Sequence, residues 1–208
     1  MHLQNRVTPF GELIATKARG TIFGNRGGRI HRDDRTLSKR AFASRRWICC
    51  VLDFKGRQRD VWGTSYTELF FLDEVTALAA GHRPCFECRR ADVNAFAEAF
   101  GKGMRMRDVP GADAMDVIIH RERIAGRIKL RHRMALDTLP DGAMVSLPGS
   151  KADEAYAVRG KKLLRWTPSG YRDAVSRPRA GDVDVLTPPS IVKALAAGFH
   201  PRWHGSAN

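Results

Sequence analysis

The chain has 208 residues, 43% of them hydrophobic and 28% charged, so it can bury a core and is too short to need more than one or two domains. Its 36 Lys and Arg residues against 22 Asp and Glu give a formal net charge of +14, which favours a polyanion such as nucleic acid as partner. No apolar run approaches the roughly 20 residues of a membrane span, and the first residues lack the apolar core of a secretion signal. We therefore expect a cytoplasmic protein with no membrane partner.

Residues 3–30 alternate short apolar pieces with turn signals such as TPFGE and GNRGG, a texture typical of strands and loops. The stretch GNRGGRIH, residues 24–31, is glycine-rich and basic, and its backbone amides could bind an anion. It lacks the spacing of a P-loop. The stretch predicts a turn in which Arg26 and Arg29 contact phosphate.

The next segment, RRWICCVLDFKGRQRDVWG at residues 45–63, predicts a hairpin of two strands with its turn at Lys55-Gly56. If the first strand continues through LDFKG, Asp53 and Lys55 share one face, as in the Asp-x-Lys element of metal-dependent nucleases. Asp34 or Asp33 would then supply an earlier acidic ligand. Ordinary cross-strand ion pairing explains the same two-residue pattern.

Two helices are predicted on either side of a cysteine pair. LDEVTALAAGHR, residues 72–83, has acidic residues in its first turn, apolar residues at helical spacing and Gly81 as its stop. ADVNAFAEAFGKG, residues 91–103, has Asp92 near its start and Gly101 past its expected end. The cysteine pair, Cys85-x-x-Cys88, lies between them.

After a loop, MDVIIHRERIAGRIKLRHR at residues 115–133 predicts a helix broken near Gly126. His120 and Glu122 are candidates for a base and a metal ligand. On a helix these two side chains point about 200° apart, whereas in a strand they would share a face, so the type of element decides between the two readings.

From about Leu139 the chain changes to short strands punctuated by turns, which predicts a small β-rich domain. We therefore expect an α+β protein with an N-terminal zinc-stabilised domain at 1–125 and a C-terminal domain at 135–208. The pattern V-x-A-L-A-A-G occurs at 75–81 and again at 192–198. A duplicated helix-turn unit and two unrelated alanine-rich helices explain it equally well.

Four cysteines in a reducing compartment indicate metal binding or chemistry more than disulfides. A Cys-x-x-Cys turn offers zinc two thiolates, and two ligands must come from elsewhere. Neighbouring strand residues point to opposite faces, so only one of Cys49 and Cys50 can join. We expect Cys50, on the face that should be covered by the following helix, and His31 as the fourth ligand. The other candidate ligands are Cys49, His120 and His132. The alternatives to a metal site are free thiols without a metal and a redox-active Cys-x-x-Cys pair.

The segment ELFFLDEVTALAAGHRPCFECRRADVNAF carries a family resemblance over residues 66–95. Its G-x-R-P-C-x-x-C turn after an aromatic strand and an alanine-rich helix resembles the second half of the metal-binding, methylphosphotriester-accepting domain of the Ada DNA repair protein. The resemblance implies that Cys85 and Cys88 bind structural zinc, and that the domain binds DNA through Arg83, Arg89 and Arg90. The upstream Cys-x-x-x-Cys of that family is missing, so we expect the zinc scaffold without methyl transfer.

The sequence thus predicts a zinc-containing protein that binds nucleic acid, DNA rather than RNA, in repair or regulation. One alternative is a metal-dependent nuclease that uses Asp53 and Lys55, with Asp34, His120 and Glu122 as further candidates. The other is a protein-interaction module whose basic charge is incidental. Whether the chain is an enzyme is left open.

Overall fold

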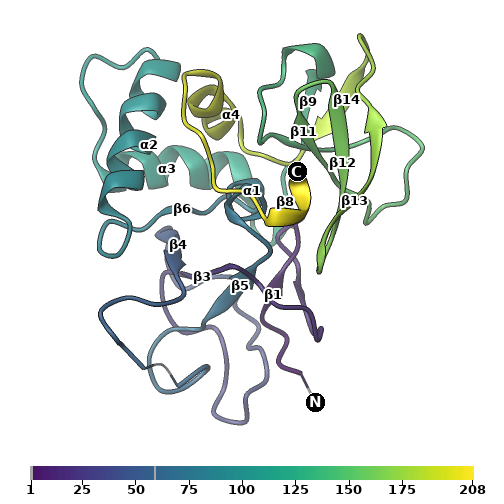
Figure 1. Cartoon of the computed structure of the whole chain (residues 1–208). Coiled ribbons are helices and arrows are strands. Elements are labelled where there is room, and N and C mark those ends of the chain that lie inside the picture. Colours follow the sequence, from purple (N-terminus) through teal and green to yellow (C-terminus); the bar gives the residue numbers. More distant parts are fainter. Residues whose placement is uncertain (1, 59) are drawn as a thin grey trace.

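The computed structural model describes residues 2–58 and 60–208 and has an α+β fold (Figure 1). The helices are α1 (Glu74–Ala79), α2 (Arg90–Gly103), α3 (Ala112–Arg123) and α4 (Pro189–Ala196), with 3₁₀ turns at Leu136–Thr138 and Gly205–Ala207. None of the helices in the described part of the chain is long and apolar enough to cross a membrane.

The first sheet has the order β2-β1-β5-β3-β4-β6. Its strands are β1 (Arg6–Val7), β2 (Leu13–Ile14), β3 (Ile22–Arg26), β4 (Trp47–Val51), β5 (Leu69–Phe71) and β6 (Arg83–Pro84). The hairpin predicted for 45–63 is wrong, because β4 pairs with β3 and β6, and the described residues between 52 and 66 form no strand. The predicted turn does occur: Lys55 and Gly56 have φ of 54° and 64°.

Helix α1 begins and ends as predicted. The Asp73 carboxylate accepts a hydrogen bond from the Thr76 backbone N–H at 2.9 Å, which caps the first turn. Gly81, with φ of +81°, follows the helix in the left-handed conformation that glycine adopts without strain. All the residues of α1 are buried, so this short helix lies at the centre of the protein (Figure 1).

Two helix ends differ from prediction. Helix α2 runs through Gly101 to Gly103, because Met104 N–H still donates to the carbonyl of Phe100. Helix α3 ends at Arg123, and the chain then forms a small hairpin of β7 (Ile124–Ala125) and β8 (Ile128–Lys129) around Gly126, which has φ of +59°. Residues 124–129 are therefore strand and turn, not a continuing helix.

The β-rich texture after residue 139 corresponds to a six-stranded antiparallel sheet with the order β13-β12-β11-β10-β14-β9. Its strands are β9 (His132–Ala135), β10 (Met144–Ser146), β11 (Tyr156–Arg159), β12 (Lys162–Thr167), β13 (Gly170–Ser176) and β14 (Asp182–Val185). A core of Leu136, Val145, Val158 and Val185 fills the inner face of this sheet.

The packing crosses the predicted domain limits of 1–125 and 135–208, which remain predictions about independent folding. Helix α4 leaves the second sheet and packs beside α2 and α3, where Ile191 and Phe199 share a core with Phe96 and Met115 (Figure 1). Val75 of α1 shares another core with residues of β10, β11 and β12. The two parts are therefore joined by two apolar contacts, one through α4 and the other between α1 and the strands β10 to β12.

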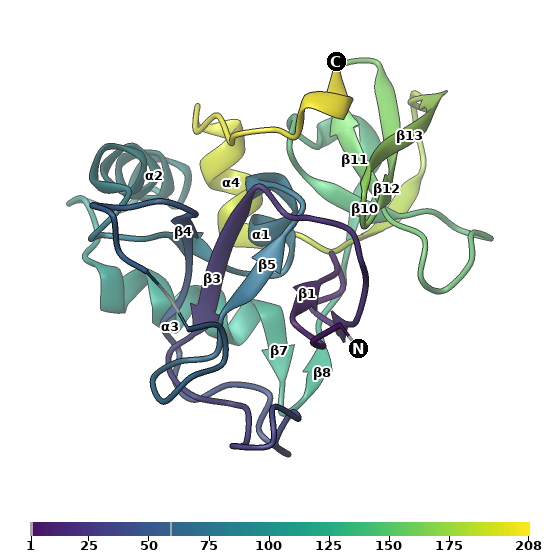
Figure 2. The same cartoon turned by 60° about the horizontal axis from the view of Figure 1, so that its bottom comes forward.

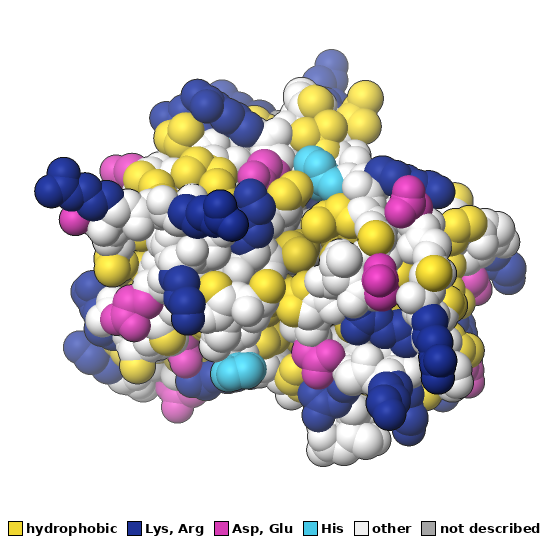
Figure 3. All heavy atoms as spheres, turned by 90° about the horizontal axis from the view of Figure 1, so that it is seen from above, with side chains coloured by type: hydrophobic (Ala, Val, Ile, Leu, Met, Phe, Trp, Pro, Cys, Tyr) yellow, Lys and Arg dark blue, Asp and Glu magenta, His cyan; other side chains and the backbone are white. Residues whose placement is uncertain are grey.

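The basic charge is spread over the surface. Figure 3 shows Lys and Arg side chains at separate places on one face, with acidic and apolar side chains between them. Several arginines are also paired with acids, for example Arg46 with Asp113 and Arg133 with Asp182. The net charge of +14 by itself therefore marks no single binding face.

Candidate metal centre

Three cysteines lie together where the first sheet meets the start of α2. The sulfur atoms of Cys50, Cys85 and Cys88 are all within 4.8 Å of one another. Zinc–sulfur bonds of about 2.3 Å in a tetrahedron place the sulfurs roughly 3.8 Å apart, so the three thiols could close around one ion with small movements. Among the residues that the structure describes, they are the one group of three or more potential metal ligands that are this close.

Backbone pairing brings the three residues together. Strand β6 pairs in parallel with β4, with Ile48 opposite Arg83 and Cys49 opposite Pro84, and the Cys85 N–H donates to the Cys49 carbonyl at 3.0 Å. The same register continued by one residue sets Cys85 beside Cys50. The Arg89 N–H then donates to the Cys85 carbonyl, which closes the turn that carries Cys88 and leads into α2.

Cys49 and Cys50 occupy opposite faces of β4. Cys49 is packed among Val7, Phe71 and Ala77, under α1. Cys50 lies on the other face in a small cluster with Phe23, Cys85 and Cys88. Cys50 joins the cysteine pair, as expected. The expectation that the following helix covers the face of Cys50 is wrong, because α1 covers the face of Cys49.

Backbone N–H groups point at the sulfurs. The Glu87 N–H donates a hydrogen bond to Cys85 Sγ at 3.4 Å, and the Val51 N–H donates one to the sulfur of Cys88. Hydrogen bonds from the thiols of Cys50 and Cys88, together with the backbone amides of Cys88 and Glu87, lower the pKa of Cys85 far below that of a free thiol. The Cys50 thiol donates to the sulfurs of Cys85 and Cys88, which raises the pKa of Cys50. One thiolate is thus stabilised in the cluster, as a metal site requires.

The structure does not bring His31 to the cysteines. Its Nδ1 contacts Thr67 Oγ1 at 2.6 Å and its Nε2 contacts the Gly63 carbonyl at 2.9 Å, while its ring stacks on Trp62. Both ring nitrogens are therefore engaged in holding the loop that follows β4. No described His, Cys, Asp or Glu joins the three cysteines as a fourth ligand.

Two of the predicted phosphate contacts, Arg83 and Arg89, are buried and paired with carboxylates. Arg83 makes a two-pronged ion pair with Asp116 at 2.7 and 2.9 Å, and both side chains are almost fully buried. Arg89 pairs with Glu74 and Asp92, both at 2.8 Å, and also donates to the Cys49 sulfur at 3.2 Å. Both guanidinium groups are therefore engaged with carboxylates inside the protein, and their role as phosphate contacts stays a prediction.

The other three predicted contacts have different environments. Arg90 is exposed beside the cysteine pair, with its guanidinium 5.4 Å from the centre of the Phe86 ring. Arg29 forms an ion pair with Asp33. Arg26 is buried, and its guanidinium lies 4.2 Å from the centre of the Trp47 ring.

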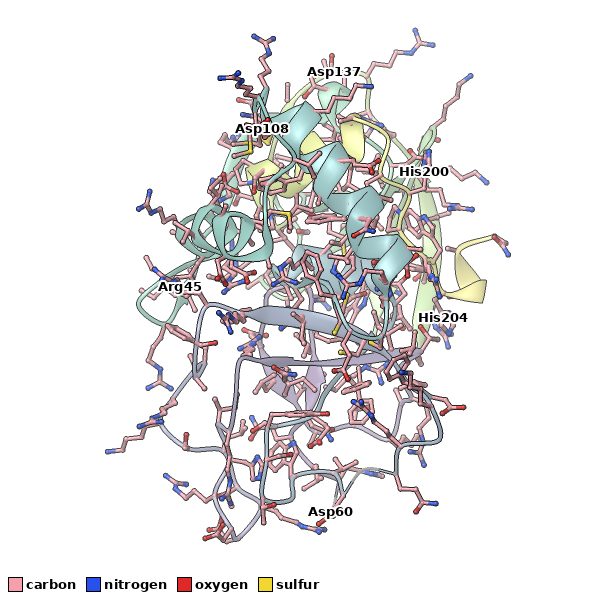
Figure 4. The ribbon with its side chains drawn as sticks, turned by 90° about the vertical axis from the view of Figure 1, so that its left-hand side faces the viewer. Arg45, Asp60, Asp108, Asp137, His200 and His204 are labelled. Atoms are coloured by element: carbon pink, nitrogen blue, oxygen red, sulfur yellow. The ribbon has the colours of Figure 1, made fainter. Side chains whose placement is uncertain are left out.

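The nuclease candidates do not form one site in the way the sequence suggested. Strand β4 ends at Val51, so Asp53 and Lys55 lie in an exposed turn and not on one face of a strand. Asp34 accepts hydrogen bonds from the backbone and side chain of Thr36, which also lower its pKa. Figure 4 shows where this long loop lies: Asp60, which belongs to the same loop as Asp53, is at one end of the molecule. Asp108 and Asp137, which are not nuclease candidates, mark the opposite end.

His120 and Glu122 lie on helix α3, so the strand reading of this segment is wrong. His120 Nδ1 contacts an Arg123 nitrogen at 2.8 Å. Glu122 accepts hydrogen bonds from the backbone N–H and hydroxyl of Ser190, at 2.9 and 2.6 Å, in the first turn of α4. Glu122 therefore ties α3 to α4, and the two residues serve different parts of the fold.

Sequence reasoning missed the groups that surround the thiols. Tyr66 packs against the cluster, and Arg57 and Glu87 form an ion pair of 2.6 Å near it. The contact from the Glu87 amide to sulfur follows from the tight Cys-x-x-Cys turn and could have been inferred from the spacing, whereas the Val51 amide comes from β4. Tyr66 and Arg57 come from the irregular loop after β4, and no local pattern indicates where that loop returns.

Comparisons of the chain with protein-family models, with curated proteins and with solved structures find no match. The likeness of residues 66–95 to the Ada domain therefore stays a prediction. Chemistry is assigned to this chain from its own residues: three clustered cysteines, which could hold a metal ion such as zinc.

Proposed function

We propose that this chain is a zinc-containing protein that binds nucleic acid, with DNA as the preferred partner, and that the zinc stabilises its N-terminal part. The observation that carries the proposal is the cluster of Cys50, Cys85 and Cys88. Thiolates at this spacing suit zinc, and the residues come from β4, from the turn after β6 and from the start of α2. A bound ion would join these three segments.

The ligand set defines what the ion would do. Three described cysteines would supply sulfur ligands, and Cys88 is the most exposed of them. The Glu87 amide donates to the sulfur of Cys85, and the Val51 amide favours the thiolate form of Cys88, although the pKa of Cys88 is raised overall. These residues would bind and orient a metal.

Charge and the surroundings of the site support nucleic acid as partner. The net charge of +14 produces a field that attracts polyanions at long range. Beside the cysteines, exposed Arg90 lies next to the half-buried Phe86 ring, a pair that suits contact with a phosphate and a base. The resemblance of residues 66–95 to a DNA-binding domain points in the same direction.

The nuclease alternative has less support, because Asp53 and Lys55 lie in an exposed turn and no described carboxylates cluster around them as a metal site would need. A protein-interaction module remains an outcome of the test below. It would show neither nucleic-acid binding nor its dependence on salt.

The proposal is tested by fluorescence anisotropy with a labelled 20-base-pair DNA duplex and the matching single-stranded RNA, at several salt concentrations. We expect DNA binding whose log K falls linearly with log salt, with a slope of about −0.9 per phosphate contact. Arg90→Ala should weaken binding and reduce the slope by about one, whereas Lys161→Ala, an exposed residue of the β11–β12 turn, should not. Zinc-loaded protein that shows no salt-dependent association would contradict the proposal.

A further inference from the structure

A basic pocket opens on the opposite face of the first sheet from the cysteines. Its volume is about 660 Å³, and its walls are the β1–β2 turn, the loop at 37–41 and the β7–β8 hairpin, which Figure 2 shows together beside β1. Trp47 lies in its wall and shares a face of β4 with Cys49, two residues on, so β4 separates the pocket from Cys50. The cationic residues of the lining are Arg26, Arg40, Arg123, Arg127, Lys129 and Arg131, against the single acid Glu12.

Two of these cations are built into the protein. Arg26 and Arg123 are only 4% and 1% exposed, and their guanidinium carbons lie 4.2 and 3.9 Å from the centre of the Trp47 ring. Both donate to carbonyl oxygens, Arg26 to Gly11 at 2.6 Å and Arg123 to Gly81 at 2.7 Å. The Nε atom of each is buried without a hydrogen-bond partner.

Lys129 adds a third charge at the same place. Its ammonium group donates to the carbonyl of Ala79 at 2.6 Å. In the described part of the chain none of the six cationic lining residues forms an ion pair with an Asp or Glu. A buried cation without an ion-pair partner is costly, and an anionic ligand would offset that cost.

The titration of these groups is consistent with an anion-binding role. Burial lowers the pKa of Arg26 to about 9. Burial also lowers the pKa of Arg123 to about 8; the charge of Asp116 opposes this shift, and Arg26 and Arg83 add to it. Burial first, and then repulsion from Arg123, Arg26 and Arg131, lowers the pKa of Lys129 to about 7. Arg83 and Arg89 are equally buried but have carboxylate partners, whereas Arg26 and Arg123 form no ion pair with any described carboxylate.

We propose that this pocket binds a phosphate-bearing ligand with two or more negative charges, through Arg26, Arg123 and Lys129 with the outer arginines at its rim. The volume accommodates a nucleoside diphosphate, and guanidinium groups match phosphate geometry. A free nucleotide and the terminal phosphate of a nucleic-acid strand offer the same chemistry. The site is separate from the cysteine cluster and goes beyond the proposed function, because a free nucleotide would bind whether or not the chain binds DNA.

The proposal is tested by isothermal titration calorimetry with inorganic pyrophosphate, with ADP, and with a tetranucleotide that carries either a 5′-phosphate or a 5′-hydroxyl group. Wild-type protein should bind pyrophosphate. Lys129→Met and the rim variant Arg131→Glu should each weaken that binding at least tenfold, whereas Lys161→Met should not. Circular dichroism and urea unfolding confirm that each variant is folded, and Arg131 is exposed, so its replacement spares the core.

The arms of the experiment separate the two sources of phosphate. Tighter binding of ADP than of either tetranucleotide indicates a free nucleotide, and a preference for the 5′-phosphorylated strand over its hydroxyl counterpart indicates a strand end. The proposal would be overturned if the wild type does not bind pyrophosphate. It would also be overturned if folded Lys129→Met and Arg131→Glu bind pyrophosphate as tightly as the wild type does. Binding of the same variants to the 20-base-pair DNA duplex is measured separately by fluorescence anisotropy. The phosphate-pocket proposal and the DNA-binding proposal can therefore fail independently of each other.

Discussion

Cys49 and Cys50 are neighbours in the chain, yet their side chains lie on opposite sides of the first sheet. Cys49 is buried with Val7 and Phe71 under α1, and Cys50 is beside Cys85 and Cys88 on the far side. A single step along a strand reverses the direction of the side chain, so one thiol belongs to the core and the other to the candidate metal centre. The pair therefore provides a matched control within one strand.

Replacement of Cys50 should remove the metal, and replacement of Cys49 should not. We expect about one zinc per chain in the wild type and in Cys49→Ala, and much less in Cys50→Ser, by elemental analysis of protein purified without chelator. Cys49→Ala should instead lower the free energy of unfolding by about 1 to 2 kcal/mol, because a buried sulfur is lost and Arg89 loses a partner. Zinc in folded Cys50→Ser at the wild-type level would show that Cys50 is not a ligand.

The buried ion pair between Arg83 and Asp116 should matter far more than the exposed pair between Arg46 and Asp113. Both acids lie on α3, but the first pair is almost fully buried and the second is mostly exposed. Asp116→Ala leaves a buried guanidinium unpaired and should cost about 3 to 5 kcal/mol of unfolding free energy. Asp113→Ala should cost less than about 1 kcal/mol. Urea unfolding measures both, and equal costs would contradict the assigned burial.

His82 should make the protein less stable in mild acid. Its side chain is fully buried, both ring nitrogens lack hydrogen-bond partners, and burial, with Arg26, Arg123 and Lys129 nearby, lowers its pKa well below 6.5. The unfolded chain therefore binds a proton near pH 6.5 that the folded protein does not bind until lower pH. Stability from this group is present above pH 6.5 and is lost as pH falls, by at most about 1.4 kcal/mol per pH unit.

The contribution of His82 is isolated by the difference between wild type and His82→Phe, which keeps an aromatic ring beside Trp47. The free energy of unfolding, measured from pH 7.5 to 5, should fall less steeply in this variant. His200→Gln, at an exposed position, should keep the wild-type slope. Parallel pH profiles for wild type and His82→Phe would show that His82 does not titrate in this way.

Gly81 should tolerate alanine less well than Gly126, although both have positive φ, of 81° and 59°. An added Cβ at Gly81 would lie 2.6 Å from Cδ of Arg123, whereas none of the described atoms beyond the chain neighbours comes within 4 Å at Gly126. Gly126→Ala should therefore cost only the backbone strain, about 1 kcal/mol, and Gly81→Ala clearly more. Urea unfolding of the two variants gives both costs, and the same cost for each would argue against the contact between Gly81 and Arg123.

The sequence by itself determined the local features of this protein. The acidic start of α1 and its glycine stop are read from neighbouring residues, because caps and turns depend on interactions within a few positions. The Cys85-x-x-Cys88 turn and the α+β texture are local in the same sense. The alternation of faces along a strand also determined that Cys49 and Cys50 cannot act together.

Only the tertiary structure decided which distant residues meet. The parallel pairing of β6 with β4 places Cys85 beside Cys50, and it leaves His31 with Thr67 and Gly63. Arg83 and Arg26 look alike in the sequence. Arg83 pairs with Asp116 on α3, whereas Arg26 lines the basic pocket and forms no ion pair with a described carboxylate. Periodicity records which way a side chain points along its own element. The charge or ligand that it meets depends on strand order and helix packing, which bring together residues that are far apart in the chain.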